Sequence, residues 1–456
     1  MHIHILGICG TFMCGVAALA RAAGHKVTGC DRNVYPPMST QLRKLGIEIH
    51  EGVDAAQLDV NPDCVVVGNV MTRGFDVVEA MLDRGMPYQS GPQWLAENVL
   101  QDRHVLAVAV THGKTTTASM LAWILEDAAL APGFLIGGIP ANFGVSARFG
   151  ESPWFVVEAD EYDTAFFDKR AKFVHYRPRT LVLNNLDYDH ADIYKDMDAI
   201  LWQFHQLMRT IPGAGRILLN GADDNLRQVV DQGCWTPVET FSTADDTEWS
   251  ARFTDSVERH IGIRGPGGQS AETRWQVGGI HNLENAIAAV AAAASAGVTV
   301  EQSAAALARF QGVKRRMERT ATVADIAIYD DFAHHPTAIG KSIRSMRRRY
   351  PGHRVLVAIE PRCNTMKMGI HKDTLAESLK DADIVWMYRP DDVGDDFEAS
   401  LQPLGDKLRM FDDYDQLVDD MSRRVLGGDQ VVFMSNGGFG SARQTLTAVL
   451  QRTRSA

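Results

Sequence analysis

The chain has no apolar run long enough to cross a bilayer, because its most apolar stretch, residues 286–298, is interrupted by Ser295 and Gly297. Its beginning has neither the cationic region nor the sustained apolar run of a secretory signal. Basic residues do not predominate either: 46 Lys and Arg stand against 57 Asp and Glu, a formal net charge of −11. We therefore expect no membrane anchor and no nucleic-acid partner, since proteins that neutralise phosphate backbones normally carry the opposite balance.

Close metal-ligand spacings of cysteine are also missing. The six cysteines are scattered along the chain, and no two of them form a C-x-x-C pair. This pattern does not favour a zinc site, and in a chain of this size it is typical of reduced thiols in a cytoplasmic protein. The sequence indicates no particular oligomeric state.

What is present is an α/β pattern that begins three times. A length of 456 residues corresponds to about three domains. Short apolar runs alternate with helical stretches, which predicts parallel sheets with crossover helices. We expect domains at residues 1–100, 101–316 and 317–456. The predicted strands are 2–6, 26–28, 64–67, 104–110, 155–157, 180–183, 216–219, 326–329, 355–359, 384–387 and 431–434, and the predicted helices are 11–23, 39–45, 114–128 and 286–296.

The strongest local motif is Val110-Thr-His-Gly-Lys-Thr-Thr-Thr117, between a predicted strand and a predicted helix. Backbone N–H groups of such a turn, together with the helix dipole, attract phosphate oxygens. Lys114 is expected to neutralise the terminal phosphates, and Thr115 to ligate Mg²⁺ through its hydroxyl. The usual eight-residue phosphate-loop pattern has glycine where this chain has Val108, so the alternative is a surface turn that happens to contain Gly-Lys-Thr.

A second glycine-containing loop, Gly7 to Gly15, follows the first predicted strand. A dinucleotide fingerprint that started at Gly7 would need glycine at Cys9 and Phe12, so the loop fails that pattern. Asp31 follows the second strand, where a ribose-binding acid lies in a mononucleotide-binding fold. A diphosphate-binding loop and a simple packing turn both remain open here.

Two acidic clusters follow predicted strands in the middle of the chain. The first is Glu158-Ala-Asp-Glu161, and the second runs from Asp187 to Asp192 and includes His190. A carboxylate at the tip of a strand beside a phosphate loop is where a Mg²⁺ ligand is expected. Solvated turns or helix caps are the alternative.

Polar segments further along the chain suggest other contacts with a nucleotide. Asn282 and Asn285 are three residues apart on a predicted helix, so both amides are able to meet an adenine edge, although capping by Asn282 is the simpler interpretation. The segment 330–336 places two adjacent histidines at a helix start, where their side chains diverge and fit capping or substrate contact better than joint metal binding. The basic run 314–316 lies at a domain junction and is a candidate phosphate contact.

Together these segments resemble the Mur ligase family, the ATP-dependent amide-forming enzymes of bacterial peptidoglycan synthesis. The resemblance covers essentially the whole chain and keeps the family's motif order. It implies an α/β fold with a Rossmann-like N-terminal domain, a central P-loop ATPase domain and a Rossmann-like C-terminal domain. The residues that it implies are Thr111, His112, Gly113, Lys114, Thr115, Thr116, Asn282, Asn285, Arg316 and Asp331 for ATP; Thr115, Glu158 and His190 for Mg²⁺; Gly7, Gly10, Thr11, Asp31 and Asn69 for a UDP-sugar; Arg362 and His334 for a peptide; and Lys114, Glu158 and His190 as catalytic residues.

Three segments, residues 7–13, 35–40 and 360–369, narrow the resemblance within the family. They are similar to members that join UDP-N-acetylmuramate to the murein tripeptide L-alanyl-γ-D-glutamyl-meso-diaminopimelate through an acyl phosphate, in peptidoglycan recycling. The alternative within the family is the addition of L-alanine alone. Outside the family, the failed fingerprint argues against an NAD-dependent oxidoreductase, and a P-loop switch protein would hydrolyse ATP without needing an acceptor.

Two positions depart from the family pattern. Glycine is usual where this chain has Val110, so a tighter or reshaped phosphate loop is expected. Some members carry a carbamylated lysine fifteen residues after the histidine that matches His190, and 190 + 15 is His205 here. We therefore expect no carbamate and a second metal that is held in another way.

Overall fold

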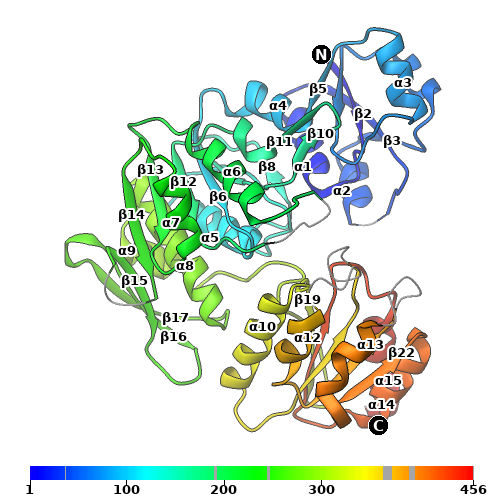
Figure 1. Cartoon of the computed structure of the whole chain (residues 1–456), viewed down its shortest axis with the longest axis vertical. Helices are drawn as coiled ribbons and strands as arrows, with labels where there is room; N and C mark the ends of the chain where they lie inside the picture. Colours follow the sequence, from blue (N-terminus) through cyan, green and yellow to red (C-terminus); the bar gives the residue numbers. More distant parts are fainter. Residues whose placement is uncertain (36, 189–192, 244–246, 363–371, 390–395, 455–456) are drawn as a thin grey trace.

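The computed structural model describes residues 1–456 except 36, 189–192, 244–246, 363–371, 390–395 and 455–456. Three β-sheets follow one another along the described chain (apart from a two-stranded hairpin), each accompanied by helices. Figure 1 shows the resulting N-terminal lobe in blue, the central lobe in cyan and green, and the C-terminal lobe in yellow to red. The predicted α/β fold with three units is confirmed.

The N-terminal sheet has five parallel strands in the order β3-β2-β1-β4-β5. The strand order reverses at β1, and in open α/β sheets ligands bind at the carboxyl ends of the strands at such a point. The strands are β1 (His2–Leu6), β2 (Lys26–Asp31), β3 (Glu48–Glu51), β4 (Cys64–Val67) and β5 (Tyr88–Ser90), and the helices are α1 (Thr11–Ala22), α2 (Met38–Lys44), α3 (Asp76–Asp83) and α4 (Gly91–Leu95).

The central sheet has ten strands in the order β17-β16-β15-β14-β13-β12-β6-β9-β7-β8. Its core is parallel, with β6 between β12 and β9, whereas β8, β16 and β17 run antiparallel to their neighbours. The strands are β6 (His104–Ala109), β7 (Gly133–Leu135), β8 (Ala147–Arg148), β9 (Trp154–Glu158), β12 (Thr180–Leu183), β13 (Arg216–Asn220), β14 (Val238–Ser242), β15 (Trp249–Phe253), β16 (His260–Arg264) and β17 (Ser270–Arg274).

The helices of the central lobe cover this sheet, and a separate hairpin lies beside it. Helix α5 packs closely on α8, so the apolar helix that follows the phosphate loop lies against the Ala-rich helix. The helices are α5 (Lys114–Asp127), α6 (Met197–Met208), α7 (Asp224–Asp231), α8 (Ile280–Ala293) and α9 (Val300–Leu307), and the hairpin is β10 (Asp163–Ala165) with β11 (Asp168–Ala171).

The C-terminal sheet has six strands in the order β18-β19-β23-β20-β21-β22, of which only the β18–β19 pair is antiparallel. The carboxyl ends of β19, β23 and β20 are therefore neighbours. The strands are β18 (Glu318–Val323), β19 (Ile326–Asp331), β20 (Val355–Ile359), β21 (Ile384–Tyr388), β22 (Leu408–Phe411) and β23 (Gln430–Met434), and the helices are α10 (Pro336–Arg349), α12 (Lys372–Leu379), α13 (Asp396–Leu401), α14 (Tyr414–Arg424) and α15 (Ala442–Arg454).

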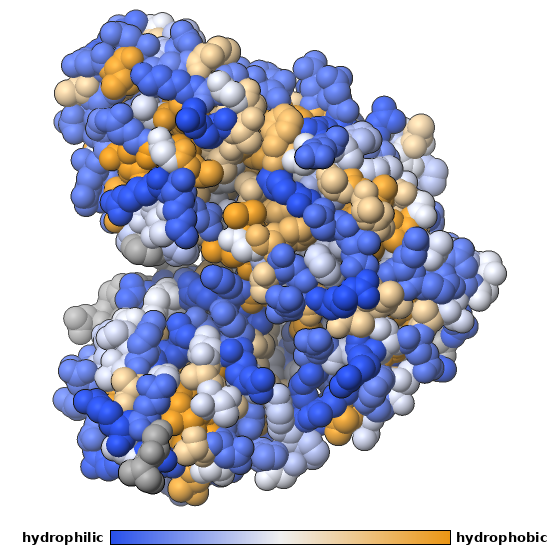
Figure 2. Space-filling view, turned by 180° about the vertical axis from the view of Figure 1, so that it is seen from behind, coloured by the Kyte–Doolittle hydropathy of each residue, from blue (hydrophilic) through white to orange (hydrophobic). Residues whose placement is uncertain are grey.

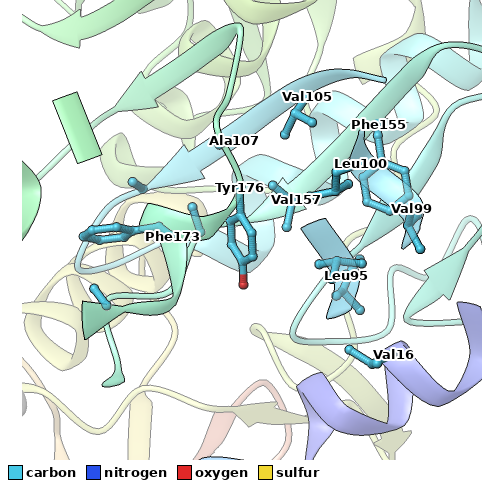
Figure 3. Packing of buried hydrophobic residues seen from close by; sticks show 14 of the residues in the cluster. Val16, Leu95, Val99, Leu100, Val105, Ala107, Phe155, Val157, Phe173 and Tyr176 are labelled. Carbon is cyan, nitrogen blue, oxygen red and sulfur yellow. The ribbon is translucent and has the colours of Figure 1, made fainter. Parts of the chain in front are cut away.

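One hydrophobic cluster runs from the N-terminal sheet into the central sheet. Figure 3 shows Leu95 of α4 between Val16 of α1 and Phe155 of the central strand β9. Gly15 permits this approach, because a Cβ there would lie 2.1 Å from Cδ1 of Leu135. The C-terminal lobe has its own clusters, so the first two lobes form one packed body and the third forms another.

The space-filling view shows a notch between the N-terminal lobe and the C-terminal lobe, with the central lobe behind it (Figure 2). Within the described ranges, every helix is too short or too polar to span a membrane.

Candidate active site

The phosphate-loop motif lies where the central sheet brings three carboxyl ends of parallel strands together. Strand β6 ends at Ala109, and α5 begins at Lys114 after Gly113, whose φ of 95° requires the left-handed conformation that glycine adopts freely. The N–H of Ala159, after β9, bonds to the β6 carbonyl of Val108. On the other side of β6, the N–H of Thr111 donates to the carbonyl of Asn185, which follows β12. Both acidic clusters therefore border the loop.

Lys114 is held inside this loop. Its Nζ donates to the carbonyl of Val110 at 2.7 Å and to the two carboxylate oxygens of Glu161 at 2.9 and 2.6 Å. Burial lowers the pKa of Lys114, but the carboxylates of Glu161 and Asp160 more than offset this and hold it above its usual value. The lysine is therefore charged, and Glu161 stands where phosphate oxygens would otherwise meet it.

Thr115 and Glu158 form the oxygen pair expected of a Mg²⁺ site. The Thr115 hydroxyl donates to Glu158 Oε1 at 3.0 Å, and the N–H of Gly137 donates to Glu158 Oε2 at 2.6 Å. Burial raises the pKa of Glu158, although the bond from Gly137 and the charges of Lys114 and Arg316 act against this. A hydroxyl and a carboxylate are hard oxygen ligands that suit Mg²⁺, so these residues fit the metal, even though the described residues contain no cluster of three His, Cys, Asp or Glu side chains.

His112 and Thr111 are tied to the loop after β12. The N–H and the carbonyl of His112 both bond to the Asn185 side chain, at 2.7 and 2.8 Å. The N–H of Asp187 donates to the Thr111 hydroxyl at 3.0 Å, and the Asp187 carboxylate lies 3.3 Å from His112 Nε2. The second acidic cluster thus supports the phosphate loop from one side. His190, which was predicted to be a metal ligand, lies outside the described residues.

Asn282 and Asn285 belong to a row of buried amides below the loop. Asn184 donates to Asn285 at 3.0 Å, and Asn285 donates to Asn282 at 3.3 Å, so the two predicted residues do share a face of α8. A Cβ at Gly113 would lie 2.6 Å from Oδ1 of Asn285. Asn285 therefore touches the backbone that is expected to hold phosphate, and its adenine contact stays a prediction. Asn282 bonds to the carbonyl of Gly278 at 2.7 Å.

Arg316 reaches the phosphate loop from the junction with the C-terminal lobe. Its Nη2 lies 3.3 Å from the Thr115 hydroxyl, and its guanidinium lies over the Phe332 ring at 4.7 Å. Burial lowers the pKa of Arg316, while Asp331 and Glu158 act in the opposite direction. Asp331, predicted to contact ribose, ends β19 and accepts hydrogen bonds from the Ser342 hydroxyl at 2.8 Å and from the N–H of Met317 at 3.4 Å.

The two adjacent histidines do diverge, as predicted. His334 Nδ1 lies 2.9 Å from the carbonyl of Phe332. His335 caps α10 by accepting from the N–H of Thr337, and its ring centroid lies 4.6 Å from that of His112. His335, which the sequence did not single out as a site residue, therefore brings the C-terminal lobe against the phosphate loop.

Arg362 lies at the end of β20, beside the buried carboxylate of Glu360. Arg362 Nε donates to Glu360 Oε1 at 3.0 Å, and half of the Arg362 side chain, 52%, stays exposed. Glu360 also accepts from the hydroxyls of Ser435, at 2.6 Å, and Tyr414. The guanidinium is thus held through Nε, and its predicted contact with a peptide carboxylate stays a prediction.

The predicted UDP-sugar residues gather at the carboxyl edge of the N-terminal sheet. Gly7 has a φ of 77°, and a Cβ there would lie 3.0 Å from Val70, so the turn that contains Asn69 lies beside it. Gly10 precedes α1, which Thr11 begins. Asp31 holds the loop closed, because its Oδ2 accepts from the N–H of Cys9 at 2.9 Å.

The structure shows the surroundings of the two positions that depart from the family pattern, Val110 and His205. Val110 is fully buried in the apolar core, and its φ is not positive, so the loop needs no glycine there. His205 lies on α6, and its ring centroid is 6.1 Å from that of Trp235, with Gly233 beside it. Its surroundings are those of a packed side chain.

Three residues that shape this geometry were not assigned from the sequence. Glu161 pairs with Lys114, Gly137 donates to Glu158, and the buried Glu258 accepts from the N–H of Gly279 at 2.7 Å. The Gly-Gly pair at 137–138, which follows a short apolar run, was a usable signal for a turn at the sheet edge. Nothing local distinguishes Glu258.

Family models match almost the whole chain. The catalytic-domain model of the Mur ligase family matches residues 2–103, the Mur ligase middle domain matches 108–293, and the glutamate ligase domain matches 315–437. The chain therefore belongs to the Mur ligase family. Members of this family are ATP-dependent ligases, so this protein is an ATP-dependent acid–amine ligase.

Individual proteins are similar over nearly the full length. The UDP-N-acetylmuramate–L-alanyl-γ-D-glutamyl-meso-2,6-diaminoheptandioate ligase of Escherichia coli (strain K12) is 51% identical over 453 residues, which cover 98% of this chain and 97% of the relative. The crystal structure of a murein peptide ligase from Psychrobacter arcticus 273-4 superposes with a TM-score of 0.77 at 46% identity, covering 99% of this chain and 98% of that one. A UDP-N-acetylmuramate–L-alanine ligase of Psychrobacter sp. (strain PRwf-1) is 30% identical, covering 98% of this chain and 94% of the relative.

Proposed function

We propose that this chain joins the lactyl carboxylate of UDP-N-acetylmuramate to the L-alanyl amine of L-alanyl-γ-D-glutamyl-meso-diaminopimelate, with conversion of ATP to ADP and phosphate. The observation that carries the choice of acceptor is the 51% identity to the tripeptide ligase, against 30% to the L-alanine ligase. The domain boundaries near residues 101 and 317 and the individual site residues are part of this proposal.

A carboxylate oxygen is a poor leaving group, so the first step has to activate it. The lactyl carboxylate attacks the terminal phosphorus of ATP, ADP leaves, and an acyl phosphate forms. Lys114 is charged and lies at the helix start, where it offsets negative charge on the transferred group. Thr115 and Glu158 would hold Mg²⁺, which would supply further neutralisation of phosphate charge. Arg316 lies 3.3 Å from the Thr115 hydroxyl, and from there it is proposed to contact the phosphate oxygens.

The second step forms the amide. The neutral amine attacks the acyl carbon, and phosphate leaves as the tetrahedral intermediate collapses. The amine has to lose a proton, and His334 and His190 are the candidate bases. If Nδ1 of His334 carries its proton toward the carbonyl of Phe332, Nε2 is its basic nitrogen. Arg362, with its exposed outer edge, is the proposed partner of an acceptor carboxylate.

The reaction is tested with the purified chain, ATP, Mg²⁺ and UDP-N-acetylmuramate, with either the tripeptide or free L-alanine as the acceptor. We expect a heavier UDP-linked product in the mass spectrum with the tripeptide, and phosphate release only when both substrates are present. Product with L-alanine alone would favour the other family activity. Phosphate release without an acceptor would favour a P-loop switch protein.

Lys114→Ala is the matched inactive variant. Because Lys114 faces the phosphates and the sugar nucleotide is proposed to bind the N-terminal sheet, turnover should fall about a hundred- to a thousandfold. Binding of UDP-N-acetylmuramate, measured by calorimetry, should stay near that of the unmodified chain. Near-normal turnover would contradict the role of Lys114.

We place this reaction in the cytoplasm, where ATP is available to the enzyme. The five described cysteines are free thiols, which agrees with a reducing compartment, and Cys363 lies outside the described residues.

A further inference from the structure

Lys172 is a buried lysine at the boundary between the N-terminal and central sheets. It begins a short 3-10 helix, Lys172–His175, and only 6% of its side chain is exposed. Its Nζ donates to Asp160 Oδ2 at 2.9 Å and lies 5.4 Å from the ring centroid of Phe12 and 5.5 Å from that of Tyr162. Because Phe12 follows the glycine loop of the N-terminal sheet, Lys172 joins the region proposed for the sugar nucleotide to the acidic end of β9.

The Lys172 ammonium has more N–H donors than it has hydrogen-bond acceptors among the described residues around it. It has three N–H groups, but within the described part of the chain a single oxygen, from Asp160, accepts from it. The two ring faces supply cation–π attraction, which does not replace hydrogen bonds to oxygen. A buried ammonium group whose N–H groups are not all hydrogen-bonded is strongly stabilised by an additional anion.

A second unsatisfied polar group belongs to the same segment. Tyr176 is 1% exposed, and no described group accepts from or donates to its hydroxyl, whereas buried tyrosine hydroxyls normally have a partner. Figure 3 shows this hydroxyl pointing away from the labelled aliphatic side chains. Burial raises the pKa of Tyr176, and the carboxylates of Asp160 and Glu158 raise it further, so the hydroxyl is protonated and able to donate. Tyr176 directly follows the short helix that Lys172 begins.

The acidic end of β9 therefore has a cation on each side. Glu161 pairs with Lys114 on the side of the phosphate loop, and its neighbour Asp160 pairs with Lys172 on the side of the glycine loop. In the proposed reaction the terminal phosphate approaches from the first side. The attacking carboxylate has to approach from the second side.

The geometry points to Lys172 as a binding residue for the lactyl carboxylate of the sugar nucleotide, with the Tyr176 hydroxyl as a second donor to the same group. The ammonium would exchange part of its contact with Asp160 for the incoming carboxylate and hold it toward the phosphate loop. This inference rests on the proposed function, because it takes UDP-N-acetylmuramate as the ligand.

The test compares two ligands that differ by the lactyl ether group that carries the carboxylate: UDP-N-acetylmuramate, which has it, and UDP-N-acetylglucosamine, which does not. Dissociation constants are measured by calorimetry for the unmodified chain, Lys172→Met, Lys172→Arg and Tyr176→Phe. Lys169→Met is the matched control, because Lys169 is a nearby lysine paired with Asp163 but 70% exposed. The double variant Lys172→Met/Asp160→Asn also removes the charge of the carboxylate that loses its Lys172 partner in the single variant. Thermal unfolding reports whether each variant folds.

For Lys172→Met we expect the affinity for UDP-N-acetylmuramate to fall about ten- to a hundredfold, since a charged hydrogen bond is lost. Affinity for UDP-N-acetylglucosamine should change less than about twofold. Lys172→Arg should restore most of the difference, and Tyr176→Phe should cause a smaller loss of the same selectivity. In turnover, KM for UDP-N-acetylmuramate should rise while KM for ATP stays constant.

An equal loss of affinity for both ligands would overturn the inference, because it would mean that Lys172 contacts the diphosphate or supports folding. Unchanged selectivity in a folded Lys172→Met variant, or in the double variant, would overturn it as well. If the unmodified chain itself fails to ligate UDP-N-acetylmuramate to either acceptor, the proposed function fails instead, so the two failures are distinct.

Discussion

Single residues at the phosphate loop are held in definite charge states by one another. Lys114 stays charged because Glu161 and Asp160 surround it, even though burial acts against the charge. Glu158 is the opposite case, because burial raises its pKa and only part of this is offset by Gly137, Lys114 and Arg316. The side chain proposed to bind Mg²⁺ thus takes up a proton at a higher pH than an exposed glutamate does.

The first prediction concerns this proton. Mg²⁺ needs the ionised carboxylate, so a raised pKa means that a proton competes with the metal at a higher pH than for an exposed glutamate. As the pH falls through that pKa, the Mg²⁺ concentration that half-saturates ATP binding should rise, by at most about tenfold per pH unit for a single proton. Glu158→Gln should bind Mg²⁺ weakly at every pH and show no such slope. A slope that persists in Glu158→Gln would assign the proton to another group.

At the scale of elements, the hairpin β10–β11 links the central lobe to the N-terminal sheet. Phe166, at its tip, packs against the cluster on β1, β2 and β4, and the neighbouring Phe167 lies edge-on to Tyr88 of β5 at 5.0 Å. The same hairpin leads directly into Lys172. Its contacts therefore set how the glycine loop faces the phosphate loop.

We predict that Phe166→Ala loosens this link. Loss of a half-buried ring should lower the free energy of unfolding by about 1–2 kcal/mol. Affinity for UDP-N-acetylmuramate should fall while affinity for ATP is kept, because the phosphate loop lies on the other sheet. Chemical denaturation and calorimetry measure the two effects. Trp202→Ala, which removes a ring that is 54% exposed on α6, is the control and should change neither.

At the scale of the whole molecule, the contacts between described residues of the C-terminal and central lobes include two that involve the ends of α10. One is the ring contact between His335 and His112. The other is Glu258, which bonds to the N–H of Gly279 and also accepts from Ser345 at 3.3 Å and from Arg348 at 3.2 Å, both on α10. Helix α10 is therefore held against the central lobe at its start and near its end. Because Ser342 of α10 bonds to Asp331, this also positions Asp331, at the end of β19, relative to the phosphate loop.

The segment that joins the lobes is itself strained. Arg315 and Met317 have φ values of 61° and 49°, conformations that cost about 1–2 kcal/mol per residue for side chains other than glycine. Hydrogen bonds hold this segment in place. The carbonyl of Arg315 accepts from the N–H of Phe332 at 2.7 Å, and the N–H of Arg315 donates to the Glu318 carboxylate. Arg316, between the two strained residues, is aimed at Thr115 as a result.

We predict that His335→Asn opens the C-terminal lobe in the absence of ligands. Asparagine keeps a good cap for α10 but removes the ring contact, which is worth about 0.5–1.5 kcal/mol. The ratio of open to closed molecules should rise about two- to tenfold, seen as a larger radius of gyration by small-angle X-ray scattering. His334→Asn is the control, because the His334 ring bonds to a carbonyl of its own lobe. An unchanged radius for His335→Asn would mean that other contacts, such as those of Glu258 and Trp275 with α10, are enough to hold the lobe.

Much of this molecule follows from the sequence. The parallel strands are short apolar runs between helical stretches, and each predicted strand is present, as with residues 104–110 at β6 and 355–359 at β20. The Ala-rich helix, on which Asn282 and Asn285 were expected to share a face, is present as α8 from Ile280 to Ala293. Strands β15, β16 and β17, at one end of the central sheet, were missed because they carry polar residues, and because burial alternates along β16 and β17.

The sequence by itself determined the class of fold, the position of the phosphate loop and the acidic strand ends, since these depend on local periodicity and on turn residues that act over a few positions. Only the tertiary structure decided which charges meet. Glu161 meets Lys114, Lys172 meets Phe12, and His335 meets His112, and the two residues of each pair lie far apart in the chain. Their pairing depends on strand order and on how the lobes pack, and burial of these groups away from water gives each pairing its strength.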